Sequence, residues 1–298
     1  MTQWFYPRGS LRRGPWESVV DDALPGWKHT GMRVGDSADA TTFTIDPDHY
    51  ERQLYVLQGS GLTVRYSLHG ETEVHTVELS GRESVFHGPA DYFYVPVGTR
   101  LDIEPRGRFM VCESVASVAK PVQLTRAAEV AQLIRGTGPA CRQVHDFGGV
   151  EHLDADRMVS VEVIVPSGNW SGIPPHKHDT YVPGVESNLE EIYYFESAPE
   201  RAFPAPALSD PMGYFRGYPS DERGFDEMVE VRTGDVMLVP YGFHGPVMAT
   251  PGYDLYFMNV MAGPDPDRSW NIVDDPRHTW VRDTWPHQTP DPRLPYTP

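Results

Sequence analysis

Short runs of β-branched and aromatic residues, separated by glycine and proline, recur along the whole chain. Runs of this length and composition are typical of β-strands, and stretches with the 3.6-residue period of an amphipathic helix are scarce. Clear examples are residues 53–57, 62–68, 159–165, 235–239 and 254–260. The pattern therefore predicts an all-β chain built from sandwiches or barrels.

The strand pattern divides the chain into two similar halves. With 298 residues, the chain suits two modules of roughly 150 residues each. A motif of an apolar residue followed by Val-Pro-x-Gly occurs at residues 94–98 and again at residues 238–242. Between these repeats, residues 124–134 predict one short helix. We therefore expect an N-terminal domain of residues 1–135 and a C-terminal domain of residues 136–298.

Composition and charge narrow the class of protein. The chain has 42 acidic and 25 basic residues, a net charge of −17, and no basic cluster. Nucleic acids and anionic membranes both attract positive surfaces, so neither is an expected partner. No run approaches the length of about 18 apolar residues that predicts a membrane span, and the N-terminus lacks a signal-peptide core. We expect a cytoplasmic protein whose oligomeric state stays open, a homo-oligomer included.

Proline and cysteine add two smaller expectations. The tail from Trp285 is rich in proline and has no regular period, so we expect it to cross the surface irregularly. Cys112 and Cys141 are the only cysteines of the chain, too few for a disulfide framework. Both are expected to be buried apolar residues.

The candidate chemistry lies in the second half. His176 and His178 stand two residues apart, and in an extended strand such residues share one face. Glu190 and Glu191 begin the next predicted strand, and His244 follows a Pro-x-Gly turn. Three neutral imidazoles and one carboxylate are a typical site for a divalent first-row metal. Alternation along the strand lets only one of the two glutamates face inward.

These residues resemble the paired signature of the cupin fold, in which His-x-His and Glu are followed by Pro-x-Gly and a further His. Longer strings are similar to the 5-deoxy-glucuronate isomerase (IolB) family, and the resemblance spans about residues 25 to 285. Several strings in the right order are far more specific than His-x-His. They are residues 26–28, 134–138, 142–144, 174–179, 189–194, 239–244, 251–256 and 259–264.

The resemblance implies an all-β bicupin, in which one chain forms two antiparallel, jelly-roll-like barrels and only the second barrel binds metal. In the first half, Arg52 stands where a cupin glutamate would precede the strand, and Arg100 stands where a histidine would follow the turn. We therefore expect a degenerate, metal-free N-terminal cupin domain and a metal-binding C-terminal domain.

The family pattern also selects one of the two glutamates. In cupins the ligand commonly lies three residues before the aromatic residue of the strand, which favours Glu191 over Glu190. Glu190 is then expected to point outward into solvent, although the choice between them stays open. The implied metal is Zn, Mn or Fe, and the implied ligands are His176, His178, Glu191 and His244.

The resemblance further implies an aldose–ketose isomerase that converts 5-deoxy-glucuronate to 5-dehydro-2-deoxy-D-gluconate in myo-inositol catabolism. A bound metal would act as a Lewis acid on the aldehyde oxygen and the neighbouring hydroxyl. A base would move a proton between adjacent carbons. The sequence does not identify this base.

The implied substrate is a small anionic sugar acid, so an acidic chain must supply a local cation for its carboxylate. Arg216 is the first candidate, because a guanidinium binds a carboxylate in bidentate fashion; its alternative role is that of a surface arginine. Tyr193 shares the face of Glu191, and Tyr256 lies on the last predicted strand. Both are candidate hydroxyl donors or, equally, core residues.

Two other functions fit the same ligands. Three histidines and a glutamate also hold Fe(II) in cupin dioxygenases, a function that predicts oxygen consumption. A non-enzymatic cupin that binds a sugar acid would turn nothing over. Incubation of metal-loaded protein with 5-deoxy-glucuronate without oxygen distinguishes the three functions.

Overall fold

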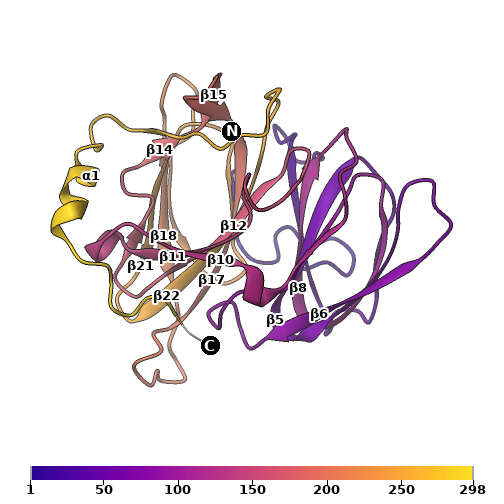
Figure 1. Cartoon of the computed structure of the whole chain (residues 1–298). Helices are drawn as coiled ribbons and strands as arrows, with labels where there is room; N and C mark the ends of the chain where they lie inside the picture. Colours follow the sequence, from indigo (N-terminus) through magenta and orange to yellow (C-terminus); the bar gives the residue numbers. More distant parts are fainter. Residues whose placement is uncertain (1, 297–298) are drawn as a thin grey trace.

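The computed structural model describes residues 2–296, and strand pairing among them is antiparallel throughout (Figure 1). No helix of this described part is long and apolar enough to cross a membrane. The predicted all-β class is confirmed. The helical elements are the short α1 (Val281–Thr284) and the 3-10 turns η1 (Ala127–Glu129), η2 (Gly138–Ala140) and η3 (Trp285–His287).

The first half forms one eight-stranded sheet in the order β2-β3-β8-β5-β7-β9, with β4 beside β8 and β6 beside β5. Its core contains Trp16, Phe43 and Phe109, whose rings pack with centroids 4.7 to 5.7 Å apart. The strands are β2 (Ser18–Val20), β3 (Thr30–Asp36), β4 (Phe43–Ile45), β5 (Tyr50–Ser67), β6 (His75–Arg82), β7 (Tyr92–Val95), β8 (Arg100–Val115) and β9 (Gln123–Thr125).

The long strands β5 and β8 bend so that this single sheet can curl around its core. Their register shifts near Gly59, where φ is +134° and an added Cβ would lie 2.3 Å from the carbonyl oxygen of Arg106. Glycine is therefore required at this crossing of the two backbones.

The second half contains two large sheets and a separate hairpin of β15 and β16. The seven-stranded sheet has the order β1-β20-β17-β22-β12-β11-β10. The six-stranded sheet has the order β19-β18-β21-β14-β23, with β13 beside β21. The strands are β1 (Phe5–Tyr6), β10 (Ala131–Arg135), β11 (Arg142–Gly148), β12 (Val159–Val165), β13 (Trp170–Ser171), β14 (His176–Lys177), β15 (Asp179–Val182), β16 (Glu186–Asn188), β17 (Glu190–Pro199), β18 (Gly213–Tyr218), β19 (Glu227–Val231), β20 (Val236–Val239), β21 (Phe243–Ala249), β22 (Tyr253–Ala262) and β23 (Val273–Asp274).

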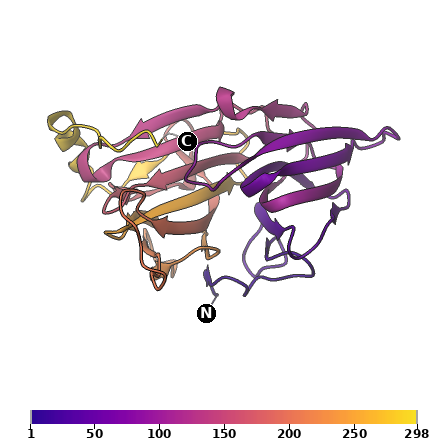
Figure 2. The same cartoon turned by 90° about the horizontal axis from the view of Figure 1, so that it is seen from below.

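The two halves lie side by side (Figures 1 and 2), and the seven-stranded sheet is buried on both faces. On one face Tyr256 and Met258 contact Tyr55 and Cys112 of the first half. Residues of the other parity, such as Tyr193, point to the second half's own interior. This arrangement explains why β12, β17 and β22 are apolar almost continuously instead of alternating with polar residues.

The predicted helix at residues 124–134 is wrong. This stretch begins in β9, passes through η1 and ends in β10, which pairs with β11. The Asp91 carboxylate accepts hydrogen bonds from the Ala127 N–H and the Arg126 guanidinium, at 2.9 and 2.7 Å. Tertiary pairing therefore outweighs the modest helix propensity of this segment.

Sheet membership does not follow sequence order at the ends of the halves. Strand β10, which ends at Arg135, and strand β1, near the N-terminus, both belong to the seven-stranded sheet of the second half. The division between residues 135 and 136 stays a prediction.

The proline-rich tail is held against the second half. The Tyr296 N–H donates to Gln143 at 2.7 Å, and the Tyr296 hydroxyl donates to Asp254 at 2.8 Å. The final residues of the predicted tail, 297 and 298, lie outside the described part of the chain.

Buried charged groups join the two halves. Arg82 of β6 donates two hydrogen bonds to Glu162 of β12, at 2.8 and 2.9 Å. Arg108 of β8 contacts Glu196 of β17 at 2.8 Å. Because each charge is removed from water, each requires its partner to remain in place.

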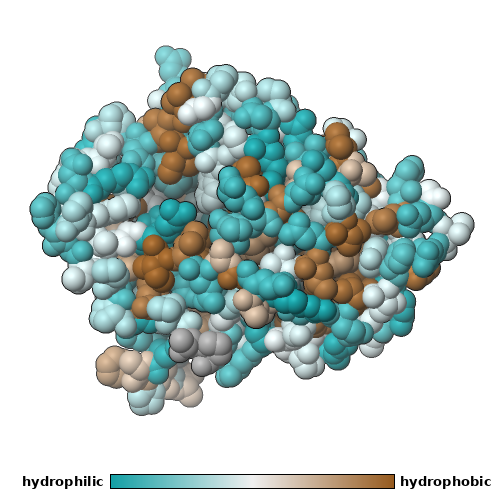
Figure 3. All heavy atoms as spheres, in the orientation of Figure 1, coloured by the Kyte–Doolittle hydropathy of each residue, from teal (hydrophilic) through white to brown (hydrophobic). Residues whose placement is uncertain are grey.

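The two cysteines are buried and most of the surface shown in Figure 3 is hydrophilic. Cys112 and Cys141 are both buried and free, as expected. In the space-filling view, hydrophilic residues cover most of the face shown, with hydrophobic residues between them (Figure 3).

We predict that Arg82→Met destabilises the protein by about 3 to 5 kcal/mol, because it leaves the Glu162 carboxylate buried without its cation. Chemical and thermal unfolding followed by circular dichroism measures this effect. The double variant Arg82→Met/Glu162→Gln should recover part of the loss. The control Arg65→Met removes an exposed pair with Glu104 and should cost no more than about 1 kcal/mol. Equal losses in Arg82→Met and Arg65→Met would contradict the prediction.

Candidate metal centre and its cavity

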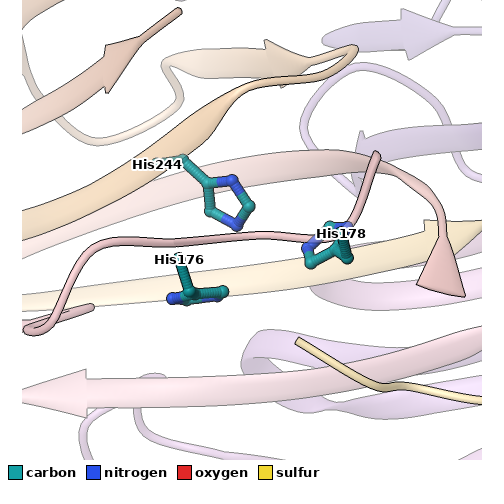
Figure 4. Close-up of side chains that lie close together, drawn as sticks. All are labelled: His176, His178 and His244. Atoms are coloured by element: carbon teal, nitrogen blue, oxygen red, sulfur yellow. The ribbon is translucent and has the colours of Figure 1, made fainter. Parts of the chain in front are cut away.

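Three histidines converge in the second half (Figure 4). His176 of β14 and His244 of β21 are directly paired across neighbouring strands, and His178 follows two residues after His176. One ring nitrogen of each histidine lies within 4.8 Å of those of the other two. The sequence spacing and the strand pairing together therefore place three imidazoles around one point.

The carboxylate of Glu191 completes this cluster. Its Oε2 lies 3.1 Å from Nε2 of His178 and 3.1 Å from Nε2 of His244, and all three side chains are buried. Burial opposes ionisation, but the hydrogen bond with His178 and the close approach of His244 lower the pKa of Glu191 to about 2. A buried carboxylate anion therefore faces the imidazoles.

The orientation of the imidazoles indicates that a cation fits here. Nδ1 of His178 lies 3.1 Å from the Leu189 carbonyl oxygen, and Nδ1 of His244 lies 3.2 Å from that of Gly242. A carbonyl only accepts hydrogen bonds, so each Nδ1 carries a proton, and each ring turns its Nε2 toward Glu191. Nε2 of His244 makes no hydrogen bond, despite the short distance. Two Nε2 atoms that converge on a buried carboxylate suit a shared positive charge, which a divalent metal supplies.

Burial also keeps His176 in the form that a metal needs. Burial and the neighbouring His244 and His178 lower the pKa of His176 well below its usual value. A neutral imidazole is the ligand form of histidine. His178 differs, because its hydrogen bond to Glu191 outweighs burial and raises its pKa.

Glu190 is not the solvated carboxylate that the sequence suggested. It points to the opposite face of β17, where it is only 8% exposed. There it accepts hydrogen bonds from the backbone N–H groups of His29 and Thr30, at 2.6 and 2.7 Å. The correction follows from the two-faced sheet, because the first half covers the face that the sequence alone leaves open to water.

A cavity of about 350 Å³ opens beside the cluster, between the two sheets of the second half. His176 and Glu191 line it together with Tyr193, whose ring centroid lies 6.2 Å from that of His244. Asn259, opposite Tyr193 on β22, also lines it and is 4% exposed, yet its Nδ2 has no hydrogen-bond partner. The cavity therefore presents unused polar groups beside the candidate ligands.

Three arginines line the same cavity: Arg135, Arg142 and Arg282. No spacing or motif in the sequence gives any of the three a role. Residues 134–138 and 142–144 were among the strings that carry the family resemblance, which was the available signal. Nothing local to those strings indicates that they lie beside His176, because the contact is made by folding of the second half.

The other predicted substrate residues lie elsewhere. Arg216 of β18 is not among the residues that line this cavity, and its Nη1 lies 2.5 Å from Asp226. Tyr256 faces the first half, where its hydroxyl donates to Glu162 at 2.8 Å and lies 3.2 Å from that of Tyr55. Of the three predicted substrate residues, only Tyr193 lies in the cavity.

Several known proteins are similar to this chain over most of its length. A protein named 5-deoxy-glucuronate isomerase from Geobacillus kaustophilus is 36% identical over 87% of this chain and 88% of its own length. One of the same name from Bacillus velezensis is 33% identical over 88% and 91%. An IolB-like protein from Salmonella typhimurium superposes with a TM-score of 0.79 at 29% identity, covering 94% of this chain and 99% of its own.

More distant structures share the architecture alone. Oxalate decarboxylase from Lactobacillus farciminis superposes with a TM-score of 0.58 at 10% identity, covering 92% of this chain and 89% of its own. This supports the predicted bicupin fold and carries no argument about activity. The sequence pattern of the KduI/IolB family matches residues 4–281. From its sequence, its fold and its histidine cluster, this chain belongs to the KduI/IolB family.

Proposed function

We propose that this protein is an aldose–ketose isomerase that converts 5-deoxy-glucuronate to 5-dehydro-2-deoxy-D-gluconate in myo-inositol catabolism. The observation that carries the proposal is the cluster of three histidines and Glu191, which opens into a cavity with unused polar groups. The names of relatives that are 36% and 33% identical support the choice of substrate.

We propose that His176, His178, Glu191 and His244 hold a divalent ion, either Zn, Mn or Fe. When bound, such an ion polarises the carbonyl group of an aldose as a Lewis acid. The hydrogen bonds from Nδ1 of His178 and of His244 to backbone carbonyls fix both rings. Fixed ring orientation supports metal affinity in histidine sites.

The isomerisation needs no oxidant or reductant. A proton leaves C2 of the aldose and a proton is added to C1, while O2 loses its hydroxyl proton and O1 gains one. Burial and the Glu191 carboxylate raise the pKa of Tyr193 well above its usual value, so its phenol keeps its proton beside the cavity. The unpaired Asn259 Nδ2 offers a hydrogen-bond donor.

We propose that residues 1–135 form a metal-free cupin domain whose role is structural. Its support is Arg52, which occupies the place of a cupin glutamate. The fully buried guanidinium of Arg52 forms ion pairs with Glu113, at 2.7 Å, and with Asp48. A fixed arginine at this position repels a metal ion instead of binding it.

The setting that we propose is a cytoplasmic enzyme that acts on a small molecule and binds no nucleic acid. The net charge of −17 supports this view, because polyanion binding requires a positive surface. A homo-oligomer is compatible with the same proposal.

We predict that His176→Ala lowers the metal content per chain and the turnover by at least about 100-fold, because it removes a ligand. Elemental analysis and an isomerase assay measure both. His87→Ala is the matched control: its imidazole is partly exposed and lies in the first half, near Glu83. The proposed ligand set is wrong if His176→Ala retains stoichiometric metal.

We predict that metal-loaded protein converts 5-deoxy-glucuronate under argon and that, in deuterated water, deuterium enters the hydroxymethyl group of the product, whose carbon was the aldehyde carbon of the substrate. A proton that passes through a base exchanges with solvent, so the label tests the proton transfer. NMR of the aldehyde proton and of the product measures both. Turnover that requires oxygen would indicate a dioxygenase, binding without turnover would indicate a sugar-acid-binding cupin, and turnover without label would indicate a hydride shift.

A further inference from the structure

The cavity beside the histidine cluster is lined by three arginines and by the carboxylates of Glu191 and Asp146. Arg135 ends β10, Arg142 begins β11, and Arg282 lies in α1. Arg282 is held by Asp274, with Nη2 2.8 Å from Oδ1. Within residues 2–296, neither Arg135 nor Arg142 forms an ion pair with a carboxylate. The side-chain hydrogen bond of Arg142 goes to the Ala140 carbonyl oxygen, at 3.3 Å.

This arrangement costs the folded protein stability. Arg135 and Arg142 stand directly opposite each other on paired strands, and like charges in that position repel. Burial and the neighbouring Arg282 and Arg135 lower the pKa of Arg142 to about 10, so it still carries its charge at neutral pH.

A second observation indicates that a ligand fills this space. The buried Asn259 Nδ2 lies in the same cavity without a hydrogen-bond partner. A buried amide that makes no hydrogen bond is costly unless a bound molecule supplies the acceptor. Arg135 and Arg142 therefore lack an anionic partner and Asn259 Nδ2 lacks an acceptor, and a sugar acid can supply both.

We propose that Arg142 and Arg135, supported by Arg282, form the subsite that binds the substrate carboxylate. The ligand class is a short polyhydroxy acid whose carboxylate binds the arginines while its carbonyl end lies at the histidine cluster. This inference rests on the proposed function for the identity of the substrate, but the binding of sugar acids in general does not depend on turnover. Arg142, and not Arg216 as the sequence suggested, is then the main residue that binds the substrate carboxylate.

A site built around unpaired guanidinium groups should reject a neutral analogue, because binding it leaves the charges uncompensated. We predict that the wild-type protein prefers 5-deoxy-glucuronate over 5-deoxy-glucose, which carries a hydroxymethyl group in place of the carboxylate. Arg142→Gln should lower kcat/KM for the acid by about 10- to 100-fold, the range expected for lost hydrogen bonds to a charged group. It should leave kcat/KM for the neutral analogue nearly unchanged. Arg135→Gln should act in the same direction with a smaller effect, because Arg135 is more exposed.

The control variants separate binding from folding. Arg232→Gln removes an exposed arginine of the second half that pairs with Asp210, and it should leave the preference intact. Because Arg142 faces Arg135 without a counter-ion, Arg142→Gln should not lower the Tm of the unliganded protein, and its metal content should stay at the wild-type level. The proposal is overturned if Arg142→Gln keeps the wild-type preference for the acid over the neutral analogue. It is also overturned if Arg216→Gln, and not Arg142→Gln, loses this preference.

Calorimetry with gluconate, a sugar acid that has no aldehyde to isomerise, tests the subsite without turnover. The metal-loaded wild-type protein should bind gluconate more tightly than the neutral glucitol, and Arg142→Gln should lose this difference. If gluconate binding depends on Arg142 but 5-deoxy-glucuronate is not converted, the subsite stands and the proposed function fails. If 5-deoxy-glucuronate is converted and gluconate binding does not depend on Arg142, the proposed function stands and the proposed subsite is wrong.

Discussion

The seven-stranded sheet of the second half is the element on which the other features depend, because it is buried on both faces. Side chains of one parity point into the cavity, and those of the other parity pack on the first half. Adjacent residues Glu190 and Glu191 show the consequence, since one caps a backbone segment of the first half and the other faces the histidines. A shift of one residue in strand register would exchange these roles and destroy both the interface and the site.

The two faces of the seven-stranded sheet also differ in how their charged and polar groups are paired. On the interface face, Arg82 and Glu162 neutralise each other, and the carboxylate of Glu51 accepts backbone hydrogen bonds from Arg157 and Met158. On the cavity face, the buried Nε2 of His244 and Nδ2 of Asn259 have no hydrogen-bond partner. The more exposed Arg135 and Arg142 stand opposite each other there. Buried groups that are satisfied hold the fold together, whereas buried groups that are unsatisfied indicate where ligands bind.

Much of this could be predicted from the sequence, for identifiable reasons. The β-rich pattern and the His-x-His spacing are local, because strand alternation fixes which neighbours share a face. The choice of Glu191 followed from alternation together with the family pattern, and the structure places it beside His178 and His244. The helix expected at residues 124–134 failed because β9 and β10 gain partners from distant strands, which a local pattern does not contain.

The sequence by itself determined the fold class and the family, and it predicted the residues of the candidate metal centre, since each depends on short-range spacing or on strings typical of a family. Only the tertiary structure decided which polar residues share the cavity. Arg142 lies more than thirty positions from His176 in sequence, yet both line one cavity, while Arg216 pairs with Asp226 outside it. The physical reason is that a guanidinium binds whatever anion the folded chain brings near it, and that proximity is set by sheet packing and not by neighbours in sequence.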